Sequence, residues 1–321
     1  MPATPGRPLA QALAEGPVVL DGGLSNQLAD QGCDLSDALW SARLLADAPE
    51  QIEAAHSAYV RAGARVLITS SYQATYEGFA ARGIGREEAT ALLRRSVALA
   101  RAAARDRDDV WVAASVGPYG AMLADGSEYR GRYGLTVAEL ERFHRPRIET
   151  LAEAGPDVLA LETVPDTDEA EALLRAVDGL GVPVWLSYTV TGETTRAGQP
   201  LEAAFRIAAD SDAVIGVGVN CCDPADAAQA VETAAATVDR PVVVYPNSGE
   251  AWDERARDWR GGSAFDPARA VDWERAGARL IGGCCRVGPG QISALVSALA
   301  PRPGKFPGRS RGDREILGRC S

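Results

Sequence analysis

Short apolar runs alternate with longer amphipathic stretches along most of the chain. Each run has the length and composition of a β-strand, and most are followed by a loop and a stretch rich in Ala, Leu and Arg with helical periodicity. The hydrophobicity of the runs is continuous rather than alternating, which is typical of parallel strands covered on both faces. The predicted strands span residues 18–23, 66–72, 110–117, 158–163, 184–190, 213–220, 242–247 and 280–285.

The amphipathic stretches predict helices over residues 87–104, 137–154, 168–180, 201–209, 225–236 and 267–276. Eight βα units without an obvious linker match a closed (β/α)8 TIM barrel better than a doubly wound sheet, which usually has fewer strands. We therefore predict an α/β protein with one barrel domain over residues 1–300. Residues 301–321 are rich in Pro, Gly and Arg and are expected to form a poorly ordered tail.

In such a barrel the active site lies at the carboxyl ends of the strands. The predicted strand interiors are apolar, whereas their ends carry polar groups and thiols, including Asp21, Thr69, Glu162, Asn220 and a pair of vicinal cysteines. The loops over residues 119–135 and 248–263 are long and rich in Gly, Tyr and Trp. Long loops on this face are candidate lids.

Composition narrows the classes of partner. Lys and Arg total 33 against 44 Asp and Glu, so the net charge is −11, and no basic cluster stands out. Nucleic acid is therefore not expected as a partner. No apolar run reaches the roughly 18 to 20 residues that a membrane span needs, and the first residues lack a signal-peptide core. We expect a cytoplasmic protein that does not bind a membrane.

The six cysteines include two vicinal pairs, which points to metal or redox chemistry rather than a secreted disulfide framework. His56 and His144 are the two histidines, and both lie in segments with helical periodicity. Cys221 follows the sixth predicted strand, and Cys284 and Cys285 end the eighth. If those ends face one another across the barrel mouth, the three thiolates form a tetrahedral zinc site with one open position. A thiol substrate bound there would be deprotonated at neutral pH.

Other roles for the cysteines stay open at this point. Cys33 is expected in the core and Cys320 to be incidental, while strand alternation turns the Cys222 side chain away from that of Cys221. For the three remaining cysteines, a disulfide or a structural metal site is as well supported by the residues as catalytic zinc.

Four motifs together resemble the homocysteine S-methyltransferase family over about residues 17–300. They are Val19-Leu20-Asp21-Gly22-Gly23, Leu161-Glu162-Thr163, Gly218-Val219-Asn220-Cys221-Cys222 and Gly282-Gly283-Cys284-Cys285. The resemblance implies the same barrel, with Zn2+ on Cys221, Cys284 and Cys285. It also implies that L-homocysteine binds near a further set of residues. These are Asp21, Gly22, Gly23, Thr69, Glu162 and Asn220.

The implied reaction is methyl transfer from a sulfonium donor to the homocysteine thiolate, which forms methionine. The run over residues 246–250 with Trp252 is similar to the branch that uses S-methylmethionine, with S-adenosylmethionine next and betaine as an alternative. The aromatic residues of the mouth loops could hold a sulfonium by cation–π attraction, although most are expected to pack the loops. The donor-side candidates are Tyr72, Tyr119, Asn247 and Trp252.

Three rival functions remain. A structural zinc in a barrel that binds a thiol without catalysis predicts no methyl transfer, and redox chemistry at Cys284 and Cys285 predicts reversible oxidation without metal. A phosphate site at the last two strands is disfavoured because no Lys lies near Gly282 and Gly283. We expect a monomer.

Overall fold

The computed structural model describes residues 5–36, 40–253 and 258–300. All eight predicted strands are present, and several end earlier than predicted because the chain turns at the barrel mouth. They are β1 (Val18–Val19), β2 (Val66–Ile68), β3 (Trp111–Val116), β4 (Val158–Val164), β5 (Val184–Tyr188), β8 (Val214–Asn220), β9 (Val242–Tyr245) and β12 (Ala278–Ile281).

These strands form one parallel sheet in the order β1-β12-β9-β8-β5-β4-β3-β2. The two outer strands meet through a parallel bridge between Leu20 and Val66. The Asp21 N–H donates to the Val66 carbonyl at 3.0 Å, and the Arg65 N–H donates to the Val19 carbonyl at 2.8 Å. The sheet thus closes on itself, and the predicted (β/α)8 barrel is confirmed.

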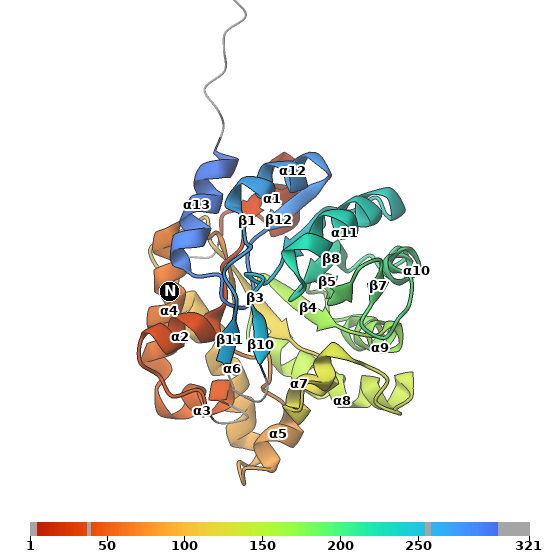
Figure 1. The fold of residues 1–321 in the computed structure, drawn as a ribbon. Helices are drawn as coiled ribbons and strands as arrows, with labels where there is room; N and C mark the ends of the chain where they lie inside the picture. The colour runs from red at the N-terminus through yellow and green to blue at the C-terminus, as the bar shows by residue number, and fades with distance from the viewer. Residues whose placement is uncertain (1–4, 37–39, 254–257, 301–321) are drawn as a thin grey trace, which may run out of the picture.

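Helices surround the barrel (Figure 1). The predicted helices appear with slightly different limits as α6 (Arg86–Ala103), α8 (Val137–Glu153), α9 (Thr167–Val177), α10 (Leu201–Arg206), α11 (Pro224–Thr237) and α12 (Ala270–Arg275), the last preceded by η2 (Pro267–Arg269). Helix α4 (Pro49–Ala62) contains His56, whose segment was predicted to be helical. The other helices were not predicted. They are α1 (Leu9–Glu15), α2 (Leu24–Asp30), α3 (Trp40–Asp47), α5 (Tyr76–Ala80), α7 (Tyr119–Leu123) and α13 (Pro289–Leu299).

Local sequence explains where several helices begin and end. Helix α8 starts with a capping box, in which Thr136 Oγ1 accepts from the Glu139 N–H and the Glu139 carboxylate accepts from the Thr136 N–H. Helix α4 has Pro49 at its first position and ends at Gly63 with φ of 101°. His56 and His144 lie in α4 and α8, as the helical periodicity of their segments predicted, and both are buried.

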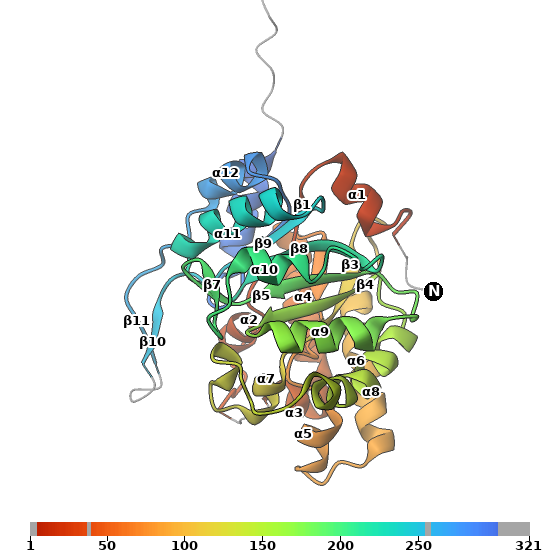
Figure 2. The ribbon, with the colours of Figure 1, turned by 90° about the vertical axis from the view of Figure 1, so that its right-hand side faces the viewer.

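The core has an outer layer between strands and helices and an inner layer inside the barrel. Helix α1 belongs to the inner layer, because Leu9 and Leu13 pack against barrel residues such as Trp111 and Leu280. The Trp111 Nε1–H donates to the Arg7 carbonyl at 2.9 Å. Figure 2 shows α1 at the opposite end of the molecule from the strand pair β10 (Ala251–Asp253) and β11 (Asp258–Arg260), so α1 closes the bottom of the barrel.

The two long mouth loops contain regular structure. The loop over residues 119–135 holds α7 and the turn η1 (Ser127–Tyr129), and the loop over residues 248–263 holds the antiparallel pair β10 (Ala251–Asp253) and β11 (Asp258–Arg260). A second small hairpin pairs β6 (Val190–Thr191) with β7 (Thr194–Thr195). No helix among the described residues is long and apolar enough to cross a membrane. The predicted tail over residues 301–321 lies outside the described residues.

Candidate active site with a three-cysteine cluster

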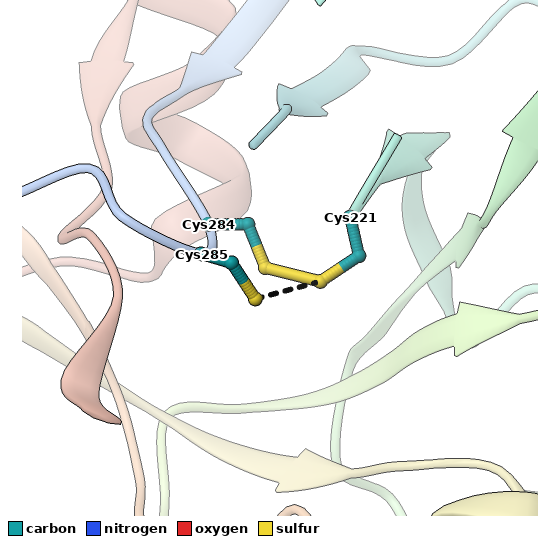
Figure 3. A group of neighbouring side chains, drawn as sticks. All are labelled: Cys221, Cys284 and Cys285. Atoms are coloured by element: carbon teal, nitrogen blue, oxygen red, sulfur yellow. Dashed lines mark hydrogen bonds between the residues drawn. A yellow bond between two sulfur atoms is a disulfide. The ribbon is translucent and has the colours of Figure 1, made fainter. Parts of the chain in front are cut away.

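The three predicted metal-ligand cysteines meet at the barrel mouth. Their sulfur atoms all lie within 4.8 Å of one another. Cys221 and Cys284 are joined as a disulfide, and the Cys285 Sγ lies 3.9 Å from the Cys221 Sγ (Figure 3). The rival redox hypothesis placed an oxidation at Cys284 and Cys285, whereas the disulfide links Cys284 to Cys221, which is 63 residues away in the sequence. Binding of a metal by all three therefore requires the reduced thiols.

Local backbone turns bring the sulfurs together. Cys221 has φ of 48°, a left-handed conformation that is uncommon for a residue with a side chain, and it follows the last residue of β8. On the other side, the Cys284 N–H donates to the Pro246 carbonyl at 2.8 Å and the Cys285 N–H to Asn247 Oδ1 at 3.1 Å. These hydrogen bonds tie the cysteine loop after β12 to the loop after β9.

The other cysteines stand apart from the cluster. Cys222 is fully buried in the outer core layer, which agrees with its predicted turn away from Cys221. Cys33 is half-buried and packs against the same layer, as expected of a core cysteine. Cys320 lies outside the described residues.

A pocket of about 140 Å³ opens beside the cluster. The three cysteines line it together with Gly22, Gly23, Thr69, Tyr72 and Glu162, all of which were predicted as site residues. The other lining residues are Leu24, Ser25, Ile68, Ser70, Gln73, Ser115, Tyr129, Thr163, Tyr245 and Gly283. Most of the predicted site residues thus share one cavity, and their contacts with substrate stay predictions.

Glu162 is the carboxylate that faces this pocket. It is 5% exposed, accepts a hydrogen bond from the Ser115 hydroxyl on one oxygen, and accepts another from the Tyr245 hydroxyl at 3.0 Å on the second. Burial raises the pKa of Glu162 to about 7, against the lowering effect of those two hydrogen bonds. A cationic group in the pocket would favour the ionised carboxylate.

Asp21 lies next to the pocket-lining glycines and is 2% exposed. Its Oδ2 accepts from the Ile68 N–H at 2.9 Å, while its Oδ1 is buried and has no hydrogen-bond partner among the described residues. Burial raises the pKa of Asp21 well above its ordinary value, and the nearby Glu162 adds to that rise. Two neighbouring buried carboxyls with unsatisfied capacity suit an ammonium group.

Gly22 and Gly23 allow the cysteine loop to pack closely. A Cβ at Gly22 would lie 2.1 Å from the Val287 carbonyl oxygen, and one at Gly23 would lie 2.7 Å from the Cys284 carbonyl oxygen. The Gly23 N–H donates to the Val287 carbonyl at 2.9 Å. That N–H is therefore already used, so at Gly23 the requirement for glycine comes from packing rather than from a free donor.

Asn220 and Thr69 belong to the hydrogen-bond framework of the site. Asn220 is fully buried, and its amide binds both the N–H of Thr163, at 2.7 Å, and its hydroxyl, at 2.8 Å. This clamp holds Thr163, a β-branched residue, at φ of 58°. The Thr69 hydroxyl lines the pocket and accepts from the Ser115 N–H at 3.0 Å. Asn220 therefore lies behind the pocket wall, and its contact with homocysteine stays a prediction.

The donor-side candidates divide into two groups. Tyr72 lines the pocket, whereas the Tyr119 ring packs on Tyr133 and Phe143, with centroids 5.2 Å and 4.8 Å away. The Asn247 amide supports the Cys285 backbone rather than lining the pocket. Trp252 lies in β10, where its backbone pairs with Trp259, and its side chain lies outside the described part of the structure.

Several residues of the site were not predicted. Tyr245 binds Glu162 and is itself contacted by the Trp185 Nε1–H, at 3.0 Å, and the Ser187 hydroxyl, at 2.9 Å. The Tyr59 hydroxyl donates to the Gly23 carbonyl at 2.8 Å and so supports the glycine turn. A hydroxyl within an otherwise apolar strand was the signal available for Ser115, Ser187 and Tyr245.

The three cysteine sulfurs fit a soft or borderline metal ion as its ligands. Three cysteine sulfurs converge beside a pocket, and neither histidine belongs to the cluster. Thiolate ligands favour zinc over magnesium or calcium, and three protein ligands leave one position for a further group. In their reduced form, Cys221, Cys284 and Cys285 are therefore suited to hold such an ion next to the pocket.

Comparison with known proteins places this barrel and its cysteine cluster in a family. The sequence profile of the family described as homocysteine S-methyltransferase matches residues 18–299. The chain belongs to the homocysteine S-methyltransferase family, which confirms the resemblance seen in its motifs.

Individual relatives cover nearly the whole chain. Homocysteine S-methyltransferase 4 of Zea mays is 43% identical over 89% of this chain and 90% of the relative. The crystal structure of the homocysteine methyltransferase MmuM from Escherichia coli in its metallated form superposes with a TM-score of 0.82. The oxidised form of the same enzyme gives 0.81. Both are 41% identical and cover 89% of this chain and 98% of theirs.

Proposed function

We propose that this protein transfers a methyl group from a sulfonium donor to the thiol of L-homocysteine, forming methionine, with zinc held by Cys221, Cys284 and Cys285. S-methylmethionine is the preferred donor in this proposal and S-adenosylmethionine the second. The observation that carries it is one pocket lined by both the three-cysteine cluster and the buried carboxyl of Glu162. A thiol amino acid needs a place for its sulfur and one for its ammonium, and the pocket offers both.

Zinc, when bound, would lower the pKa of the substrate thiol and so supply a thiolate at neutral pH. The chain's own residues orient the substrate. Glu162 accepts a hydrogen bond from the ammonium, and Asp21 Oδ1, which has no hydrogen-bond partner among the described residues, is a second acceptor nearby. Ser115 and Tyr245 fix the Glu162 carboxylate in place through their hydroxyls.

Methyl transfer needs alignment more than proton chemistry. The new bond joins the homocysteine sulfur to the methyl carbon, while the bond from that carbon to the donor sulfur breaks and leaves its electron pair on the donor. A cationic donor thus becomes neutral, and no side chain has to take up a proton in this step. The pocket contributes by holding the two sulfur atoms in line with the methyl carbon and by limiting access of water once both substrates fill it.

The experiment is methionine formation from homocysteine with S-methylmethionine, S-adenosylmethionine and betaine in turn, using reduced protein whose metal content is measured in parallel. Turnover with a sulfonium at about one zinc per chain is the expected result. Zinc without turnover by any of the three donors would favour the rival structural site. The cytoplasmic location and the monomeric state stay predictions.

A further inference from the structure

The rim of the pocket pairs an aromatic ring with an arginine from a different loop. Tyr129 in η1 lines the pocket, and its side chain is still 37% exposed. The Arg196 guanidinium, in the turn after β7, lies over the Tyr129 ring with Cζ 5.7 Å from the centroid. Arg196 Nε is buried, yet within the described residues it has no hydrogen-bond partner. A buried guanidinium N–H without an acceptor is available to bind an anionic group.

Further contacts join the loop that carries Tyr129 to the turn that carries Arg196. The Arg132 N–H donates to Asp166 Oδ2 at 3.0 Å, and the Arg132 Nε and Nη2 donate to the Ala197 carbonyl at 3.0 Å and 2.7 Å. Gln199 Nε2 donates to the other Asp166 oxygen at 2.7 Å. Arg132 and Asp166 thus hold η1 and the turn after β7 together. These hydrogen bonds therefore hold the backbone of Arg196 close to Tyr129.

Two groups of opposite charge lie beside the Tyr129 ring. Glu128 precedes Tyr129 in η1, and its Oε2 is buried without a hydrogen-bond partner in the described part of the chain. The Arg196 guanidinium lies over the ring itself. An acid and a base therefore flank an aromatic side chain that lines the pocket.

We propose that Glu128, Tyr129 and Arg196 form the subsite for the methyl donor, with Arg196 bound to the donor's α-carboxylate and Glu128 with the Tyr129 ring beside its sulfonium. This inference rests on the proposed function and makes Arg196 a residue that determines donor specificity. A sulfonium amino acid carries its cation and its carboxylate at opposite ends of a short aliphatic chain, so it can present its carboxylate to Arg196 and its sulfonium to Glu128. Betaine has both charges around a single carbon and does not span the subsite.

Arg196→Gln tests the subsite with two donors that differ in the carboxylate. For S-methylmethionine, we expect KM to rise about tenfold or more, because a charge-assisted hydrogen bond is lost. For the trimethylsulfonium ion, which has no carboxylate, kcat/KM should not change. If that ion is not turned over, its inhibition constant against S-methylmethionine is compared instead. The KM for homocysteine should also stay constant, and Arg196→Lys should restore part of the affinity for S-methylmethionine.

Arg130→Gln is the matched control, because Arg130 is an exposed arginine on the same mouth loop as Tyr129 and its loss changes the net charge equally. If kcat/KM falls equally for S-methylmethionine and the trimethylsulfonium ion in Arg196→Gln, Arg196 only packs the loop. If the KM for homocysteine rises, Arg196 belongs to the homocysteine subsite. Either result overturns the proposal. If the unmodified protein transfers no methyl group, the proposed function fails. In that case, calorimetry of S-methylmethionine binding to the unmodified protein and to Arg196→Gln still decides whether Arg196 binds the carboxylate.

Discussion

The two ends of the barrel differ in packing and in how far their buried polar atoms are hydrogen-bonded, although the same strands form both. At the bottom, Leu9 and Leu13 of α1 belong to the same buried cluster as Trp111, and the indole N–H of Trp111 donates to the Arg7 carbonyl. At the mouth, Asp21 Oδ1 is buried and has no partner among the described residues, and both Thr163 and Cys221 have positive φ. Backbone strain and unsatisfied polar atoms at one end are typical of a functional site, while complete packing at the other supplies stability.

The largest expected effect comes from removing a sulfur at the mouth. Cys284→Ala, like Cys221→Ala or Cys285→Ala, should lose the metal and reduce methionine formation on the order of a thousandfold, because several kcal/mol of activation of the substrate thiol disappear. Metal analysis by mass spectrometry and a methionine assay measure both effects. Cys33→Ala is the control and should keep metal and activity, since Cys33 packs against the core away from the cluster. Full activity in metal-free Cys284→Ala would end the mechanism.

A substitution at the bottom of the barrel should lower stability and leave substrate binding unchanged. Leu13 is 1% exposed, so Leu13→Ala leaves a cavity and should lower the free energy of unfolding by about 3 kcal/mol. The homocysteine KM of the folded fraction should stay unchanged, because no pocket residue is touched. Denaturant unfolding and steady-state kinetics below the transition test the two statements. Leu123→Ala, at a leucine that is 42% exposed, is the control and should change neither. A raised KM in Leu13→Ala would show that the two ends are not independent.

Glu162→Gln should weaken homocysteine binding by about 2 kcal/mol, or about thirtyfold in KM, since the amide cannot give the ammonium an ionic partner. Metal content should stay the same, because Glu162 is not part of the sulfur cluster. Kinetics with homocysteine varied at saturating donor measure the change. The donor KM, determined on the same preparation, is the internal control. Unchanged homocysteine kinetics would remove Glu162 from the substrate site.

The same contrast explains what the sequence could predict. The strands and the thiol cluster were predicted because continuous apolar runs and paired cysteines are visible without knowing any contact. Ser115 and Tyr245 were missed as Glu162 partners, because their convergence depends on how neighbouring strands are aligned. Helix α1 was missed because it is only 7 residues long, has no side-chain cap and gains its order from burial in the barrel. The pairing of Cys221 with Cys284 likewise depends on spatial proximity.

A pH series gives the smallest effect and separates substrate binding from stability at one residue. The pKa of Glu162 is raised to about 7 by burial, so its ionised fraction rises about tenfold from pH 6 to pH 8. The homocysteine KM should fall about as much over this range if the ammonium needs the ionised carboxylate.

The stability of the free protein should fall over the same pH range in which the affinity for homocysteine rises. An acid whose pKa is higher in the folded state than in the unfolded state stabilises the fold fully below the unfolded value of 4.5. That contribution is lost as the pH rises toward about 7. Chemical unfolding of the free protein between pH 5 and pH 8 should therefore show a downward slope that is shallower in Glu162→Gln. Saturating homocysteine should oppose the slope, since its ammonium replaces the proton that the buried carboxylate has lost. A KM that is flat with pH would mean that the ammonium binds elsewhere in the mouth.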